Sequence, residues 1–91
     1  MRLHGIVQSA HLEENPPGSD TIEMVLRVQG VGPGHPRAIV LPFERLLQDP
    51  TLDPETVQGH AFEAEVDRVG GARWVVAEIQ FAERRILRPN E

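Results

Sequence analysis

A glycine pair, Gly70-Gly71, separates two segments rich in valine, isoleucine and aromatic residues in the last third of the chain. A two-residue hairpin turn of the primed type needs positive φ angles, which glycine adopts without steric cost. Strand-forming residues on both sides of such a turn are typical of two antiparallel strands. The pattern therefore predicts a β-hairpin over residues 60–81.

The register of this hairpin follows if its turn holds two residues, because opposed residues then share one face of the sheet. The first face is apolar and comprises Val66/Val75, Ala64/Ala77, Phe62/Ile79 and His60/Phe81, with Arg68/Arg73 at its rim. The second face is polar and comprises Asp67/Trp74, Glu65/Val76 and Glu63/Glu78. We expect the first face to be buried, and Trp74 and Val76 to lie on the exposed one.

Three more strands are predicted before the hairpin. They cover residues 2–12, 21–29 and 37–41, and segments rich in proline and glycine separate them. The second strand alternates strictly, and its predicted core side carries Ile22, Met24, Leu26 and Val28. Gly5, inside the first strand, predicts a bulge or a sharp bend.

Two short helices are predicted between the third strand and the hairpin. Apolar residues at helical spacing begin at residue 43, and Pro50 ends that helix after one or two turns. Asp53 is a favourable N-cap and Pro54 a favourable first helical residue. Gly59 is placed to terminate this second helix after about one turn.

The composition is that of one small globular domain. The chain has 91 residues, of which 40% are hydrophobic and 25% charged. It has no cysteine, which excludes disulfides and thiolate metal sites and is typical of the cytoplasm. No apolar run approaches the roughly 18–20 residues that span a bilayer. We therefore expect a soluble cytoplasmic protein that folds as a single domain over residues 1–91, with 82–91 as a C-terminal tail.

The order of the elements predicts the fold. Three strands, a short helical segment and two more strands are the arrangement of the OB-fold, a five-stranded Greek-key barrel. We therefore predict an all-β, OB-like barrel with its helical segment between the third and fourth strands. Strand count alone leaves another small barrel, such as an SH3-like one, as an alternative.

Residues 37–87 resemble the second half of bacterial single-stranded DNA-binding proteins. The similarity is carried by the spacing of three segments, IVLPFERLLQ, QGHAFEAEV and ARWVVAEIQF. They match a strand that leads into a short helix, a strand preceded by glycine, and a strand with an early aromatic residue. The resemblance implies an OB barrel and a groove for single-stranded nucleic acid.

The chain departs from that family in features that nucleic-acid binding uses. The long basic and aromatic hairpin of the family is reduced to Gly70-Gly71, and the chain has no lysine, no tyrosine and one tryptophan. The predicted polar face carries carboxylates, which repel phosphate. The net charge is −5, with 14 acidic residues against 9 basic ones, whereas sequence-independent phosphate binders are usually basic.

The residues best suited to hold single-stranded nucleic acid lie on the second and third strands and on the hairpin. They are Arg27, Arg37, Arg68, Arg73 and Trp74. Arginines neutralise phosphates and an exposed tryptophan can stack on a base. A purely structural interpretation stays open, in which the arginines pair with Asp67, Glu23 or a terminal carboxylate and Trp74 is covered by a loop or the tail.

A role in protein interaction or self-assembly is the alternative function. Val25, Trp74 and Val76 are apolar residues on faces predicted to be exposed, where they could pack against a partner or a second copy of the chain. This alternative predicts a homodimer or a larger species. Composition favours it, whereas topology favours nucleic-acid binding.

Catalysis and metal binding are not predicted. The chain has four histidines, none of which is spaced two or four residues from another as a preorganised metal site requires. No phosphate-binding or nucleophile motif is present. We therefore expect a binding module without enzymatic activity, cofactor or metal.

Overall fold

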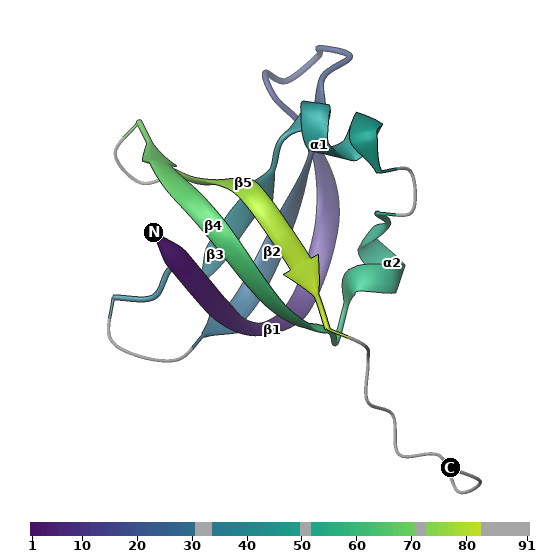
Figure 1. Ribbon diagram of the computed structural model, residues 1–91. Helices are drawn as coiled ribbons and strands as arrows, with labels where there is room; N and C mark the ends of the chain where they lie inside the picture. Colours follow the sequence, from purple (N-terminus) through teal and green to yellow (C-terminus); the bar gives the residue numbers. More distant parts are fainter. Residues whose placement is uncertain (31–33, 50–51, 71–72, 83–91) are drawn as a thin grey trace, which may run out of the picture.

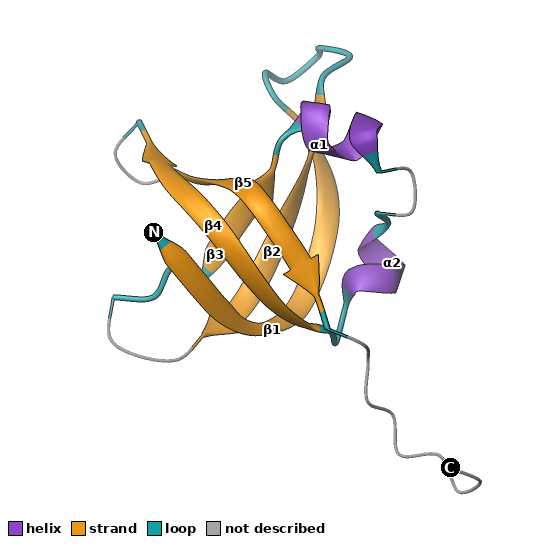
Figure 2. Ribbon diagram, in the orientation of Figure 1, coloured by secondary structure: helices purple, strands orange, loops and turns teal. Residues whose placement is uncertain are grey.

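The computed structural model describes residues 1–30, 34–49, 52–70 and 73–82 (Figure 1). Five strands and two short helices follow one another in the predicted order, and strands predominate (Figure 2). The elements are β1 (Arg2–Glu14), β2 (Ile22–Gly30), β3 (Ala38–Leu41), α1 (Phe43–Gln48), α2 (Pro54–Val57), β4 (Ala61–Val69) and β5 (Arg73–Phe81). The all-β class with a helical segment between the third and fourth strands is confirmed.

The five strands form one sheet that closes into a ring in the order β1-β2-β3-β5-β4. β1 joins the two ends of this sheet, because its first residues pair with β4 and its later residues pair with β2. Neighbouring strands are antiparallel except β3 and β5, which run parallel with Val40 opposite Val75. In Figure 1, β4, β5 and the start of β1 form the near wall of the ring, and β2 and β3 form the far wall.

β1 changes register where it passes from one neighbour to the other. Gly5 pairs with Gly30 of β2 and with Phe62 of β4, so two backbones approach it closely. A Cβ atom at Gly5 would lie 2.9 Å from the Cα atom of Gly30 and closer still to the carbonyl oxygen of Gln29. The predicted bulge falls slightly later than Gly5, between Val7 and Ser9.

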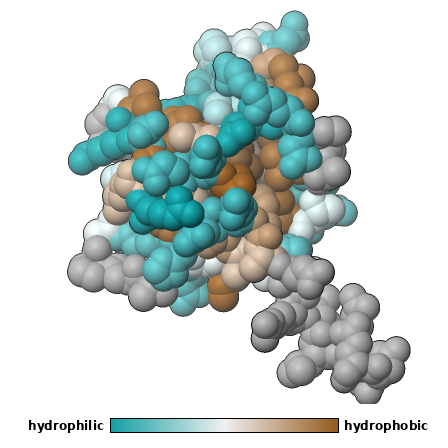
Figure 3. All heavy atoms as spheres, in the orientation of Figure 1, coloured by the Kyte–Doolittle hydropathy of each residue, from teal (hydrophilic) through white to brown (hydrophobic). Residues whose placement is uncertain are grey.

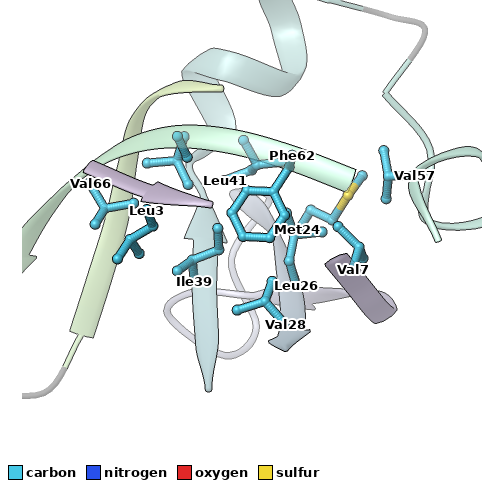
Figure 4. Close-up of a cluster of buried hydrophobic side chains, with 12 residues drawn as sticks. Leu3, Val7, Met24, Leu26, Val28, Ile39, Leu41, Val57, Phe62 and Val66 are labelled. Carbon is cyan, nitrogen blue, oxygen red and sulfur yellow. The ribbon is translucent and has the colours of Figure 1, made fainter. Parts of the chain in front are cut away.

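The hydrophobic core fills the ring. Met24, Leu26 and Val28 of β2 are buried, as their strict alternation predicts, whereas Ile22 lies at the exposed start of the strand. Side chains from all five strands and from α2 converge in this core (Figure 4). Its buried members are Leu3, Val7, Met24, Leu26, Val28, Ile39, Leu41, Val57, Phe62, Ala64, Val66 and Val76.

The hairpin forms as predicted, but its predicted register is wrong. Val69 pairs with Arg73, and Val66 with Val76, each one residue later on β5 than the two-residue turn requires. A bulge then adds one residue on β5, so that Ala64 pairs with Ile79. Gly70 has the expected positive φ, 63°, while Gly71 lies outside the described residues.

This shift changes which residues of β5 face the core. Val76 is 2% exposed and belongs to the core, so the prediction that it lies on the polar face is wrong. Trp74 is half-buried and packs against the core instead of standing on the exposed face. After the bulge at Ala77, the inward and outward positions on β5 again match the prediction. Ile79 and Phe81 therefore pack against the core as predicted.

The residues at the two ends of α2 act as predicted. The side chain of Asp53 accepts a hydrogen bond from the backbone N–H of Glu55 at 2.8 Å, and Pro54 is the first helical residue. Gly59 follows with a positive φ of 84°, and its N–H donates to the carbonyl of Val7 at 2.8 Å. The end of α2 is thereby tied to β1. Neither α1 nor α2 has the length and apolar composition needed to cross a membrane.

Candidate functional site

Two of the arginines that the sequence singles out, Arg27 on β2 and Arg73 on β5, lie on one outer face of the sheet, on either side of β3. On β2 and β3, residues that alternate with core residues point outward. Arg27 pairs with Ala38, and the parallel register of β3 and β5 puts Ala38 beside Arg73. One row across three strands therefore contains an arginine, a small residue and a second arginine. The next row along the strands contains Val25, Val40 and Val75.

A groove of about 430 Å³ lies beside this row, where β2 leads into the β2–β3 connection. Arg27 and Arg37 both line it, together with uncharged polar side chains and one imidazole. The lining residues are Gln8, Arg27, Val28, Gln29, Gly30, His35, Pro36 and Arg37. None of these described lining residues is acidic. We call this feature the arginine groove.

Backbone contacts fix the walls of the arginine groove. The N–H of Val28 donates to the carbonyl of Arg37 at 2.8 Å, which extends the β2–β3 pairing by one residue. The imidazole of His35 lies directly against Gly30, where any Cβ atom would overlap the ring. Its Nδ1 is 2.9 Å from the carbonyl oxygen of Pro36, and its Nε2 is 3.2 Å from that of His4. These contacts hold the β2–β3 connection against β1.

The two arginines of the groove carry exposed positive charge. Arg27 and Arg37 are exposed, and within the described residues no ion pair joins either guanidinium to a carboxylate. A guanidinium presents several N–H donors in a planar fork that fits phosphate or carboxylate oxygens. The amide groups of Gln8 and Gln29, which hydrogen-bond each other at 3.2 Å, add donors and acceptors beside them. The groove therefore presents guanidinium and amide donors of the kind that anions accept, in a protein of net charge −5.

Arg73 differs from these two because it is paired. Its guanidinium forms an ion pair with the carboxylate of Glu23 on β2. Glu23 was one of the partners that the structural interpretation of the sequence anticipated, and for Arg73 that interpretation is confirmed. The second oxygen of Glu23 accepts a hydrogen bond from Asn15 Nδ2 at 2.9 Å.

Arg68 and Trp74 form a pair of their own at the end of the hairpin. They are opposite each other on β4 and β5, and the guanidinium carbon of Arg68 lies over the Trp74 ring, 5.8 Å from its centroid. This distance fits a cation–π contact. Because Trp74 also packs against the core, little of its ring is available for stacking on a base.

The near wall has the opposite charge. Glu63, Glu65 and Glu78 line a groove of about 250 Å³ with Arg2 and Arg45. Arg2 lies 3.1 Å from a carboxylate oxygen of Glu63 and 3.9 Å from one of Glu65. Hydrophilic side chains gather over the middle of this wall in Figure 3. The predicted row of carboxylates is thus present, on the side of the ring away from the arginine groove.

The structure therefore places the residues of each predicted site in different surroundings. Of the five residues predicted to bind nucleic acid, Arg27 and Arg37 share one groove, Arg73 lies in the same row but is paired, and Arg68 and Trp74 contact each other. Of the three predicted interface residues, Val25 is half-buried on the outer face, Trp74 is half-buried against the core, and Val76 is buried inside it. The buried position of Val76 excludes it from an interface in the folded protein.

Sequence reasoning missed several residues of the groove. Gln29 could have been found, because it has the same phase as Arg27 on a strictly alternating strand. Gln8 lies at the irregularity in β1, and His35 reaches the groove from the β2–β3 connection, where it contacts Gly30. No local pattern marks those two positions.

Comparisons of the chain with protein-family models, with curated proteins and with solved structures found no significant match. The assignment of a function consequently depends on the geometry and charge described above.

Proposed function

We propose that the protein is a non-catalytic binding module of the OB-fold type that binds single-stranded nucleic acid through the arginine groove. The strand order supports the fold assignment, because β1 pairs at both ends of the sheet, β3 runs parallel to β5, and the helices lie between β3 and β4. Oligonucleotide-binding OB barrels use the face of their second and third strands. The arginine groove lies on that face.

The observation that carries the proposal is the charge of the groove. Two exposed arginines stand together, and in the described part of the chain neither forms an ion pair and no carboxylate lines their groove, although the protein as a whole is acidic. The phosphate backbone supplies closely spaced anions that such groups neutralise. The amides of Gln8 and Gln29 are placed to hydrogen-bond a sugar or a base edge.

The same geometry limits the strength of binding. No aromatic residue is among the described residues that line the groove, and stacking on aromatic side chains is the second main source of affinity for single strands. We therefore expect electrostatic binding with little sequence preference, and dissociation constants of roughly 1–100 μM, the range of non-specific binding.

The proposal is tested with a fluorescein-labelled oligothymidine of about 15 nucleotides, a length chosen to cover the site of one OB fold. Two phosphate contacts give a slope of about −1.4 for log affinity against log salt concentration, because each single-strand phosphate contributes about −0.7. Arg27→Ala and Arg37→Ala should each remove about half of that slope. Fluorescence anisotropy between about 50 and 200 mM salt measures it.

Arg2→Ala is the matched control, because it removes one positive charge from the opposite wall. It should leave the slope unchanged. Nucleic-acid binding is excluded if no binding occurs at about 300 μM protein, which is above the expected range of dissociation constants. Equal effects of Arg27→Ala and Arg2→Ala on the slope would exclude the arginine groove as the binding site.

A role in self-assembly or protein binding is the second candidate. The row of Val25, Val40 and Val75 favours it, because Val25 and Val75 are apolar and only half-buried on the outer face, while Val40 between them is nearly buried. Absence of oligothymidine binding together with a dimer mass in light scattering would favour this role over the first.

A further inference from the structure

The ion pair between Glu23 and Arg73 spans β3, the strand that pairs with β2 beside the arginine groove. Glu23 lies on β2 and Arg73 on β5, and β3 is the strand between them. Val40, which points outward from β3 between its core neighbours Ile39 and Leu41, is only 9% exposed. The ion pair therefore starts at Arg73, in the row that holds Arg27, and crosses the outer face over β3.

Glu23 is held firmly in this arrangement. It is 8% exposed, and its two carboxylate oxygens are bound by different partners, one by Arg73 and the other by Asn15. A carboxylate with so little access to water requires such partners. A phosphate that took Arg73 away would leave Glu23 nearly buried and without its counter-charge. Glu23 consequently withholds Arg73 from a ligand.

We propose that Glu23 sets the number of phosphates that the site can bind, because its carboxylate occupies the guanidinium of Arg73, which lies in the same row as Arg27. The inference deepens the proposed function and rests on it. With Glu23 in place the site has two phosphate contacts, from Arg27 and Arg37. When the charge of Glu23 is removed, Arg73 becomes a third contact one strand beyond Ala38.

Glu23→Gln tests this directly, because glutamine keeps the size of the side chain and removes its charge. At about 50 mM salt we expect affinity for labelled oligothymidine to rise by about 3–10-fold, and the salt slope to steepen by about 0.7. Glu13→Gln is the matched control. Glu13 pairs with Glu23 across β1 and β2 and contacts His11, so its removal changes the net charge equally without releasing Arg73.

Arg73→Ala completes a double-mutant cycle. In the wild-type background it should leave the salt slope unchanged, because Arg73 is occupied by Glu23. In the Glu23→Gln background it should abolish the gain in affinity. Circular dichroism and the urea midpoint of each variant show whether it is folded. If Glu23→Gln does not fold, Arg73→Ala in the wild-type background still tests the proposal, because a change in its salt slope would contradict it.

The outcomes separate the two proposals. Wild-type protein that does not bind oligothymidine overturns nucleic-acid binding itself. Wild-type protein that binds overturns the role of Glu23 if Glu23→Gln behaves like Glu13→Gln, if the gain survives Arg73→Ala, or if Arg73→Ala alone flattens the wild-type slope.

Discussion

Arg27 and Arg73 are the same type of residue, but their positions in the sheet give their guanidinium groups different partners. Both point outward in the same row of the sheet, on strands that flank β3. Arg73 has a carboxylate within reach and Arg27 has none among the described residues. The sequence identifies both as candidates, but the distance between a guanidinium and a carboxylate 50 residues away is a property of the folded chain.

Leu26 and Leu47 form a second contrast at the scale of residues, and it gives a test of the core. Leu26 is 0% exposed on β2, whereas Leu47 is 66% exposed on α1. Leu26→Ala should lower the free energy of unfolding by about 2–5 kcal/mol, because it leaves a cavity in the ring. Urea denaturation measures the change.

Leu47→Ala is the same substitution at the surface and should change stability by less than about 0.5 kcal/mol. Equal losses from the two substitutions would contradict the core described for Leu26.

At the scale of elements, the bulge at Ala77 determines which residues of β5 in the hairpin face the core. It adds one residue to β5 between the pairs Val66–Val76 and Glu65–Glu78. The guanidinium of Arg45, on α1, donates a hydrogen bond to the carbonyl of Ala77 at this bulge. A bulge interrupts the regular pairing, so a donor from outside the sheet stabilises it. Sequence analysis predicts the hairpin from local signals but cannot locate a bulge stabilised by a helix more than 30 residues earlier.

Arg45→Gln tests the contribution of α1 to this bulge. We expect the free energy of unfolding to fall by about 1–2 kcal/mol, in the lower part of the range for hydrogen bonds from a charged group, because the contact is solvent-exposed. Thermal unfolding measures this as a decrease of several degrees in Tm.

Arg37→Gln is the control, because Arg37 is exposed and the structure gives its side chain no ion pair. It should leave Tm nearly unchanged. A Tm for Arg45→Gln equal to that of Arg37→Gln would show that the bulge does not depend on α1.

At the scale of the whole molecule, closure of the sheet separates two surfaces of opposite charge. The near wall holds Glu63, Glu65 and Glu78, and the far wall holds the arginine groove. The net charge of −5 averages over these walls and therefore describes neither of them. A net charge that disfavours phosphate binding is thus compatible with a local site for phosphate.

Closure also predicts cooperative unfolding. One core connects all five strands, and the single tryptophan, Trp74, packs against it. Small domains with one core usually unfold in a single transition. In urea, the fluorescence of Trp74 and the far-UV circular dichroism should therefore change with the same midpoint and the same steepness. An earlier fluorescence transition would show that the hairpin unfolds separately from the rest of the ring.

Local patterns in the sequence determined the elements of this protein. The alternation in β2, the capping of α2 by Asp53 and the positive φ of Gly70 depend on residues close together in the chain, and each was predictable. The tertiary structure alone decided which arginines are free, where Trp74 points and which residues share a groove. These features depend on pairing register and on ion pairs between distant strands, and a one-residue bulge on β5 is sufficient to reverse the face of the β5 residues between it and the turn.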